Sequence, residues 1–112
     1  MPDEGTGLDL GRYAEPAVLV LASLSDGDKH GYAIMADVEA FSGLRMGPGT
    51  LYAVLARLEQ AGVVAPLPAD DRRRPYRITA AGSAALAERL DEMARFVRVG
   101  RARLRQPDRA RA

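Results

Sequence analysis

The chain has 112 residues, of which 47% are hydrophobic and 28% are charged, and it contains no cysteine and no tryptophan. This length fits one domain with a modest core, and the apolar fraction excludes a chain that is disordered throughout. The absence of cysteine excludes disulfides, thiolate metal ligands and cysteine nucleophiles. The net charge of +1 conceals a gradient, because residues 1–44 sum to −6, 45–77 to +3, 78–94 to −2 and 95–112 to +6. Basic charge is therefore concentrated in the middle and at the end of the chain, which bears on its partners.

Nothing in the sequence has the pattern of a targeting signal or a membrane span. The first residues are acidic and lack the charged-then-apolar order of a signal peptide. The longest apolar run, from Ala17 to Ala22, is far shorter than the roughly 20 residues that a membrane helix needs. We therefore expect a cytoplasmic protein with no membrane contact. Residues 1–12 contain three glycines and alternating charges, and we expect them to form a flexible N-terminal arm.

The apolar stretch after Pro16 fits either a buried strand or a buried helix, since periodicity alone does not separate the two. Proline at the first helical position, with Glu15 before it, favours a helix. A clearer helix is predicted from His30 to Ser42, and Gly43 ends it as a C-terminal cap. Its apolar positions, spaced i, i+4 and i+7, are Ile34, Val38 and Phe41.

A second helix is predicted from Pro48 to Ala61, with Gly47 as its N-cap and Gly62 at its end. Its apolar stripe consists of Leu51, Val54, Leu55 and Leu58. Two short helices joined by a short turn form a helix-turn-helix candidate.

After the second helix the sequence changes to the pattern of extended chain. Residues 63–67 and 75–79 form two short runs, with a polar loop between them. This loop carries three consecutive basic residues, here called the wing arginines: Arg72, Arg73 and Arg74. The pattern predicts a short β-hairpin, the wing, directly after the second helix of the pair.

A long helix is predicted from about residue 80 to about residue 104. Its apolar positions repeat in heptads, with Gly100 in one slot, and are Leu86, Leu90, Met93, Val97 and Leu104. At about 1.5 Å per residue this helix extends roughly 40 Å, more than a compact domain of this size needs. Its first two turns can cover the core, but the stripe beyond Met93 has little to pack on within one chain. We therefore predict a homodimer with the apolar stripe of this helix at its interface. Its two-fold symmetry would place the two copies of the Pro48–Ala61 helix roughly 34 Å apart.

The predicted fold class is mainly α with a small β-hairpin, a winged helix-turn-helix followed by a long C-terminal dimerisation helix. The boundaries are expected at 1–12 for the arm, 13–79 for the winged helix-turn-helix, 80–105 for the dimerisation helix and 106–112 for a disordered basic tail. The tail is rich in arginine, and a solvated terminus is favoured over a role in phosphate binding.

Catalysis is not expected from this sequence. It has one histidine and no cysteine, and it lacks the H-E-x-x-H pattern, a P-loop and a G-x-G-x-x-G turn. His30 lies near Asp26 and Asp28, but a lone histidine at a helix start is far more often structural. A metal site would need two or three further ligands of the right type. We therefore predict no enzyme, no metal and no cofactor.

Three features together favour nucleic-acid binding. The helix from Pro48 presents Thr50, Ala53 and Arg57 opposite its leucine stripe, which is the geometry of a recognition helix. Small residues at its start allow close approach to a groove, and Arg57 can reach a phosphate or a guanine edge. The wing arginines can lie over a minor groove or the DNA backbone. Each residue alone also fits a solvated surface, so the prediction depends on their combination.

These residues carry a resemblance to the PadR family of winged-helix transcriptional regulators, over about residues 15–97. The matching pieces are His30-Gly31-Tyr32, Pro48-Gly49-Thr50-Leu51-Tyr52, Leu55 with Arg57-Leu58-Glu59, Gly62, Tyr76-Arg77-Ile78-Thr79 and Gly82. One departure is Gly47, where the family often has serine. Another is the compact wing, which has Pro75 before the last strand and no glycine at its tip.

The resemblance implies a homodimeric repressor with a single C-terminal helix, a palindromic operator in double-stranded DNA and release by an unknown small-molecule effector. The residues that it places at the DNA are Tyr32, Thr50 and Tyr52, with the wing arginines Arg72, Arg73 and Arg74 beside them. The full set of predicted DNA contacts also includes Arg45, Pro48, Gly49 and Arg57. Some members hold a flat aromatic ligand between tryptophans at the dimer centre, and this chain has no tryptophan. The side chains that could line an effector pocket here, and that fit a dimer core better, are Tyr13, Met93, Phe96 and Val97.

One alternative stays open, a winged helix that serves as a protein-interaction or dimerisation module without an operator of its own. The near-zero net charge and the acidic first 44 residues favour it. Retention on a heparin or DNA column at low salt distinguishes the two functions.

Overall fold

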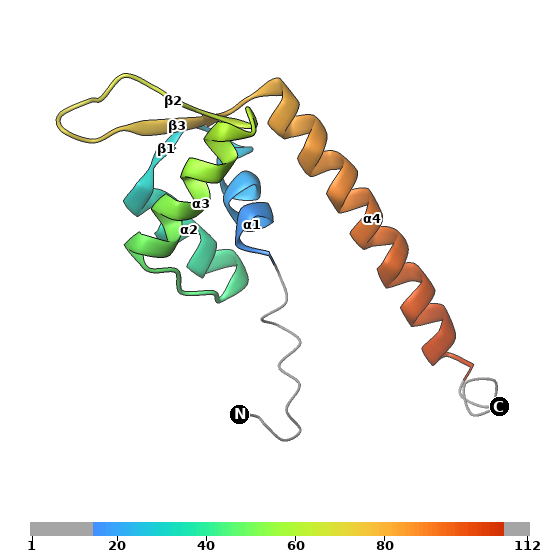
Figure 1. Ribbon diagram of the computed structural model, residues 1–112. Coiled ribbons are helices and arrows are strands. Elements are labelled where there is room, and N and C mark those ends of the chain that lie inside the picture. Colours follow the sequence, from blue (N-terminus) through green and yellow to red (C-terminus); the bar gives the residue numbers. More distant parts are fainter. Residues whose placement is uncertain (1–14, 107–112) are drawn as a thin grey trace.

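The computed structural model describes residues 15–106, and within them it has four helices and one three-stranded antiparallel sheet (Figure 1). The elements in chain order are α1 (Pro16–Leu24), β1 (Lys29–His30), α2 (Gly31–Ser42), α3 (Pro48–Gln60), β2 (Val64–Pro66), β3 (Pro75–Ile78) and α4 (Ala80–Leu104). The predicted fold class, a winged helix-turn-helix with a long C-terminal helix, is confirmed. The predicted arm of residues 1–12 and residues 107–112 of the predicted tail lie outside the described residues.

The apolar stretch after Pro16 is a helix. Pro16 occupies its first turn, and the Leu19 N–H donates to the Glu15 carbonyl oxygen at 3.2 Å. The buried side chains of α1 are Leu19, Val20, Leu21, Ser23 and Leu24. They lie on several sides of the helix because α1 contacts α2, α3, α4 and β3. A helix that is buried on several sides shows no clear apolar period, which is why the sequence pattern was ambiguous.

α2 and α3 form the helix-turn-helix. α2 ends at Gly43, whose φ of 77° is left-handed and whose N–H donates to the Glu39 carbonyl oxygen at 2.9 Å, as predicted for a C-terminal cap. The predicted stripe is right for Ile34 and Val38, which are fully buried, and wrong for Phe41, which is 50% exposed. Phe41 stays exposed because the last turn of α2 contributes no side chain to the core.

The sheet has one strand more than the sequence predicted. β2 and β3 form the predicted wing and pair antiparallel, from Val64 opposite Ile78 to Pro66 opposite Tyr76. β1 pairs with the other side of β3, so the strand order is β1-β3-β2. A strand of two residues carries no period to detect, and it forms only because the fold brings it against β3.

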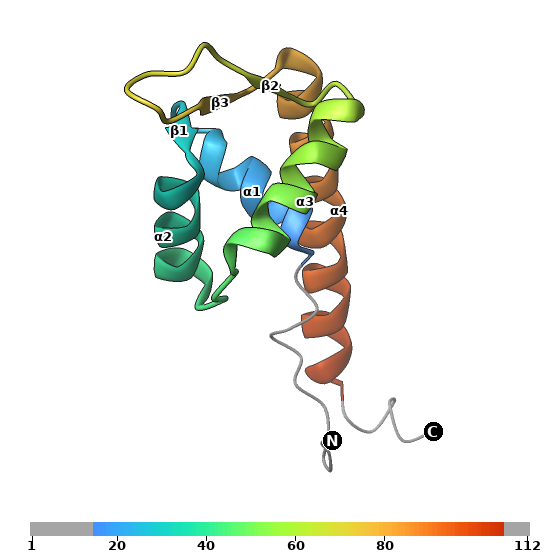
Figure 2. The same ribbon diagram turned by 60° about the vertical axis from the view of Figure 1, so that its left-hand side comes forward.

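α4 begins against the body of the molecule and then leaves it. The Thr79 side chain caps its start, because Oγ1 accepts from the Gly82 N–H at 3.0 Å and donates to the Gly62 carbonyl oxygen at 2.8 Å. Two turns later, Arg89 pairs with Glu15 at the start of α1, with 3.3 Å between Nη2 and Oε1. Beyond this ion pair, α4 extends past the ends of the other helices (Figures 1 and 2).

One hydrophobic core joins the helices and the sheet. Its buried side chains are Leu19, Val20, Leu21, Leu24, Ile34, Val38, Met46, Leu51, Val54, Leu55, Leu58, Val64 and Leu86. Leu86 is the residue that α4 contributes to it. Within residues 15–106, no helix has both the length and the apolar character needed to cross a membrane.

Candidate nucleic-acid interface

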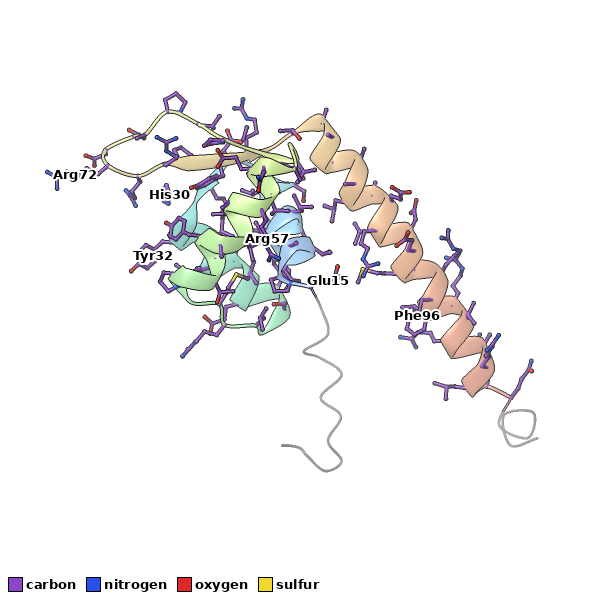
Figure 3. The ribbon with its side chains drawn as sticks, viewed as in Figure 1. Glu15, His30, Tyr32, Arg57, Arg72 and Phe96 are labelled. Atoms are coloured by element: carbon purple, nitrogen blue, oxygen red, sulfur yellow. The ribbon has the colours of Figure 1, made fainter. Side chains whose placement is uncertain are left out.

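The wing, α3 and the start of α2 enclose an open cavity of about 380 Å³. This site, here called the wing cavity, is lined by His30, Gly31, Tyr32, Tyr52, Arg72, Arg73, Arg74 and Tyr76. Tyr32, from α2, and Arg72, from the tip of the wing, point to the same side of the molecule (Figure 3). Elements that are distant in the sequence therefore present aromatic and cationic side chains on one surface.

The wing cavity is cationic. No acidic side chain lines it, and the wing arginines form no ion pair with any other residue between 15 and 106. Burial raises the pKa of the Tyr76 hydroxyl, Tyr52 and Glu59 raise it further, and Arg74 opposes them. Tyr76 is therefore neutral near pH 7 and can donate a hydrogen bond. Guanidinium groups beside tyrosine hydroxyls are donors suited to phosphate oxygens.

The wing turns tightly at residues 71 and 72. The Asp70 N–H donates to the Arg73 carbonyl oxygen at 2.6 Å, and the Arg73 N–H donates to the Asp70 carbonyl oxygen at 2.9 Å. Between them Asp71 (φ 51°) and Arg72 (φ 70°) are both left-handed, as in a type I′ turn. The wing therefore closes without a glycine, although residues other than glycine rarely adopt this left-handed conformation. This turn places Arg72 at the outermost point of the wing (Figure 3).

α3 exposes a face of small residues. Gly49, Ala53 and Ala56 follow one another along the helix, and all three are exposed. With about 3.6 residues per turn, Tyr52 lies at one edge of this face, and Thr50 and Arg57 lie at the other. The buried leucines and Val54 occupy the opposite side of the helix. A narrow face of small residues between polar edges suits insertion into the major groove of DNA.

The structure brings only part of the predicted DNA-contacting set together. Tyr32, Tyr52 and the wing arginines line the wing cavity. Residues 48–50 are exposed in the first turn of α3, outside the cavity lining. Arg57 is exposed farther along the same helix (Figure 3).

Three lining residues were not among the predicted contacts: His30, Gly31 and Tyr76. His30 Nδ1 is buried with no hydrogen-bond partner among the described residues. The sequence features that could have identified these three residues are the matching segments His30-Gly31-Tyr32 and Tyr76-Arg77-Ile78-Thr79. Arg45, another predicted contact, lies outside the cavity lining and pairs with Glu39 at 3.3 Å, with both side chains exposed. Among residues 15–106, no group of three or more potential metal ligands clusters closely enough to hold an ion.

Salt bridges and hydrogen bonds hold β1, and with it the start of α2, against the wing. Arg77 in β3 donates to both carboxylate oxygens of Asp28, with 3.1 Å between Nε and Oδ1 and 2.9 Å between Nη2 and Oδ2. These hydrogen bonds hold the pKa of Asp28 below its ordinary value. Lys29 donates to the Ser23 carbonyl oxygen and pairs with Asp26.

The apolar stripe of α4 changes its surroundings along the helix. Leu86, which was predicted for the dimer interface, is buried in the core of its own chain and needs no partner to cover it. The other predicted interface residues are between 42% and 81% exposed: Leu90, Met93, Val97 and Leu104. Phe96, a predicted effector contact, is 77% exposed on the same segment (Figure 3). Tyr13, also predicted for the effector pocket, lies outside the described residues.

Comparison with known proteins relates the chain to regulators of transcription. A family model described as "Transcriptional regulator PadR-like family" matches residues 20–88. This range reaches from α1 into α4 and includes the whole wing cavity.

Relatives in sequence agree with this match. Transcriptional regulator Rv3488 of Mycobacterium tuberculosis is 40% identical over 84 residues, which cover 70% of this chain and 78% of that protein. An uncharacterized 37.1 kDa protein in transposon TN4556 of Streptomyces fradiae is 48% identical over 85 residues, or 76% of this chain. The match spans only 25% of that Streptomyces protein.

Solved structures share the fold. A transcriptional regulator from Clostridium thermocellum is 27% identical, with a TM-score of 0.68 and coverage of 75% of this chain and 87% of that one. A PadR family transcription regulator from Clostridium difficile, 24% identical, has a TM-score of 0.69 and coverage of 74% and 91%. RosR of H. salinarum is 26% identical, with a TM-score of 0.64 and coverage of 74% and 76%.

Proposed function

The chain belongs to the PadR-like family of transcriptional regulators, and from this premise we propose that it is a dimeric repressor that recognises a palindromic operator in double-stranded DNA. Members of the family regulate transcription and are not enzymes, which agrees with the lack of catalytic motifs in the sequence. The finer parts of the proposal concern how DNA is bound, what forms the dimer and what releases the DNA.

One surface carries the DNA-binding part of the proposal. The wing cavity gathers Tyr32, Tyr52 and the wing arginines beside the exposed face of α3, with no acidic side chain in its lining. In this proposal, α3 inserts its small residues into a major groove, where Thr50 and Arg57 face the base edges and phosphates. The wing arginines then lie on the neighbouring backbone or minor groove.

The exposed end of α4 supports the dimer. Leu90, Met93, Val97 and Leu104 continue a heptad stripe beyond the core, where a second copy of the helix can cover them. A two-fold axis through this contact relates two recognition helices, and a palindromic operator has the same symmetry. We place Leu86 outside this contact because its own chain already buries it.

An effector acts through the dimer in this proposal. Met93 and Val97 belong to the helix stripe that forms the contact, and Phe96 lies beside it. A small molecule bound there would change the distance between the two recognition helices. DNA is the partner, and the proposed location of the protein is therefore the cytoplasm.

The decisive experiment is fluorescence anisotropy of the full chain against the DNA upstream of its own gene and against a shuffled control, at several salt concentrations. We expect tight binding to the upstream fragment alone, with one dimer per site, and a dimer by sedimentation at micromolar protein. Equal and weak binding to both DNAs would contradict the proposal. That result would favour the alternative module, which dimerises or binds proteins without an operator.

A further inference from the structure

Tyr52 is seated on a glycine of another helix. Gly31, the first residue of α2, is buried, and the Tyr52 hydroxyl occupies the space where a side chain at residue 31 would begin. A Cβ built on Gly31 would also lie 2.9 Å from Tyr52 Cζ and 3.3 Å from Leu51 Cδ2. A side chain at residue 31 would therefore require the Tyr52 ring, and to a smaller extent the Leu51 side chain, to move.

The backbone does not explain the glycine. Gly31 does not have a positive φ, so every residue could adopt its conformation. Alanine forms helices better than glycine, and nothing about the first position of a helix requires the smaller residue. Among residues 15–106, the space that a side chain at residue 31 would need is taken by the Tyr52 ring and, less closely, by Leu51.

The Tyr52 ring lies where the three parts of the DNA-binding surface meet. Gly31 comes from α2, Tyr52 from α3 and Tyr76 from β3 of the wing, and all three line the wing cavity. Tyr52 is still 48% exposed, so its ring both packs on Gly31 and faces the cavity. Next to Gly31, Tyr32 is 76% exposed on the same surface. A shift of the Tyr52 ring would therefore change the shape of this surface between Tyr32 and the wing.

We propose that Gly31 is a positioning residue for operator recognition, because its missing side chain leaves the space in which the Tyr52 ring is seated and so sets where that ring lies beside α2 and the wing. Gly31 itself need not touch DNA. This inference rests on the proposed function, since it assumes that the surface recognises a specific operator.

The test is a double-mutant cycle with Gly31→Ala and Tyr52→Ala, measured by anisotropy on the operator and on random DNA. Gly31→Ala is expected to lower operator affinity about tenfold and affinity for random DNA less than about twofold, because a shifted contact loses base readout before it loses charge. In the Tyr52→Ala background, the same change at Gly31 is expected to alter operator affinity less than about twofold. Tyr52→Phe removes the hydroxyl oxygen, the atom nearest to residue 31. In the Tyr52→Phe background, Gly31→Ala should therefore lower operator affinity less than it does in the unchanged protein.

Equal losses on operator and random DNA would overturn the proposal and leave Gly31 with a packing role. The same conclusion would follow if Gly31→Ala had an undiminished effect without the Tyr52 ring. Thermal unfolding without DNA, for the unchanged protein, the two single alanine variants and the double alanine variant, separately measures how much the Gly31–Tyr52 contact contributes to stability. If the unchanged protein prefers no DNA sequence, the proposed function and the positioning role both fail. If it prefers an operator and the cycle shows no coupling, only the positioning role fails.

Discussion

The wing cavity and the far end of α4 are both exposed, and their surfaces differ in shape and chemistry. The wing cavity is concave, and three elements supply its tyrosines and its three arginines. The end of α4 is a single helix whose exposed stripe is made of leucine, methionine and valine. Charge attraction favours binding of a polyanion to the wing cavity. The release of water from apolar surface favours binding of an apolar partner to the end of α4. The contrast fits two partners for one small chain, DNA and a second copy.

α4 shows the same contrast within one element. Leu86 and Leu90 are successive members of one stripe, yet Leu86 is 7% exposed and Leu90 is 47% exposed. The body of the molecule covers the helix as far as the Arg89–Glu15 ion pair and does not cover the predicted interface residues beyond it. The same apolar pattern therefore serves folding at one end and is available for association at the other.

The largest effect on stability is expected at the folded end of α4. Leu86→Ala removes a buried side chain and leaves a cavity, so the free energy of unfolding should fall by about 2–5 kcal/mol. Urea unfolding measures this loss. A change below about 1 kcal/mol would show that Leu86 does not contribute to the core in solution.

The largest effect on assembly is expected at the other end. Leu90→Glu combined with Val97→Glu places like charges in the proposed contact, so the protein should sediment as a monomer. Operator affinity should then fall about 100-fold or more, because two linked half-sites become two separate binding events.

The matched control for this pair adds the same charges on the opposite side of the helix. Ala84→Glu combined with Ala102→Glu changes two exposed residues that lie off the stripe. This control should sediment and bind DNA like the unchanged protein. If the variant with Leu90→Glu and Val97→Glu sediments as a dimer, the stripe does not form the dimer interface.

A smaller effect, of another kind, is expected at the wing. Replacing all three wing arginines by alanine should weaken binding to every DNA sequence, on the order of tenfold at low salt. The slope of log affinity against log salt should fall by about 5.4 for the dimer, if each of its six wing arginines neutralises one phosphate. Anisotropy at several salt concentrations measures both quantities.

Two arginines of α4 and the arginine at its C-cap provide the control for the wing. Arg95, Arg98 and Arg105 are exposed and lie off the apolar stripe, so their replacement by alanine removes the same charge from the other surface. We expect a much smaller change in the salt slope. Equal changes in the two triple variants would mean that total charge, and not the position of the wing, governs affinity.

The smallest effect is expected at the Asp28–Arg77 ion pair. Because the pKa of Asp28 is lowered in the folded state, its contribution to stability is present above the pKa of the unfolded chain, about 4, and is lost as pH falls through the lower, folded value. Asp28→Asn should therefore lower the Tm by a few degrees at most near pH 7, since the pair is exposed. The difference from the unchanged protein should disappear in acid. A difference that persists at the acid end of the titration would assign it to packing.

Several elements were predictable because their signals are local. Proline at the start of α1, glycine after α2 and the leucine spacing of α3 and α4 each act within a few residues of chain. The order of helix pair, wing and long helix followed from them, and the hairpin pattern indicated the wing arginines. Tyr32 and Tyr52 became candidates only through the family resemblance. The expectation that the chain is not an enzyme agrees with its family, whose members regulate transcription.

Other features depended on contacts between distant segments, and no local pattern encodes them. β1 is a strand only because β3 lies beside it, and Gly31 matters only because Tyr52, on another helix, occupies its space. Phe41 and Leu86 have the same kind of local spacing, yet packing leaves the first exposed and buries the second. The sequence by itself determined the helices, the wing and their order, because helix caps and apolar periods act over short distances. Only the tertiary structure decided which apolar residues are buried and which residues meet at the wing cavity, because both depend on which surfaces the folded chain brings together.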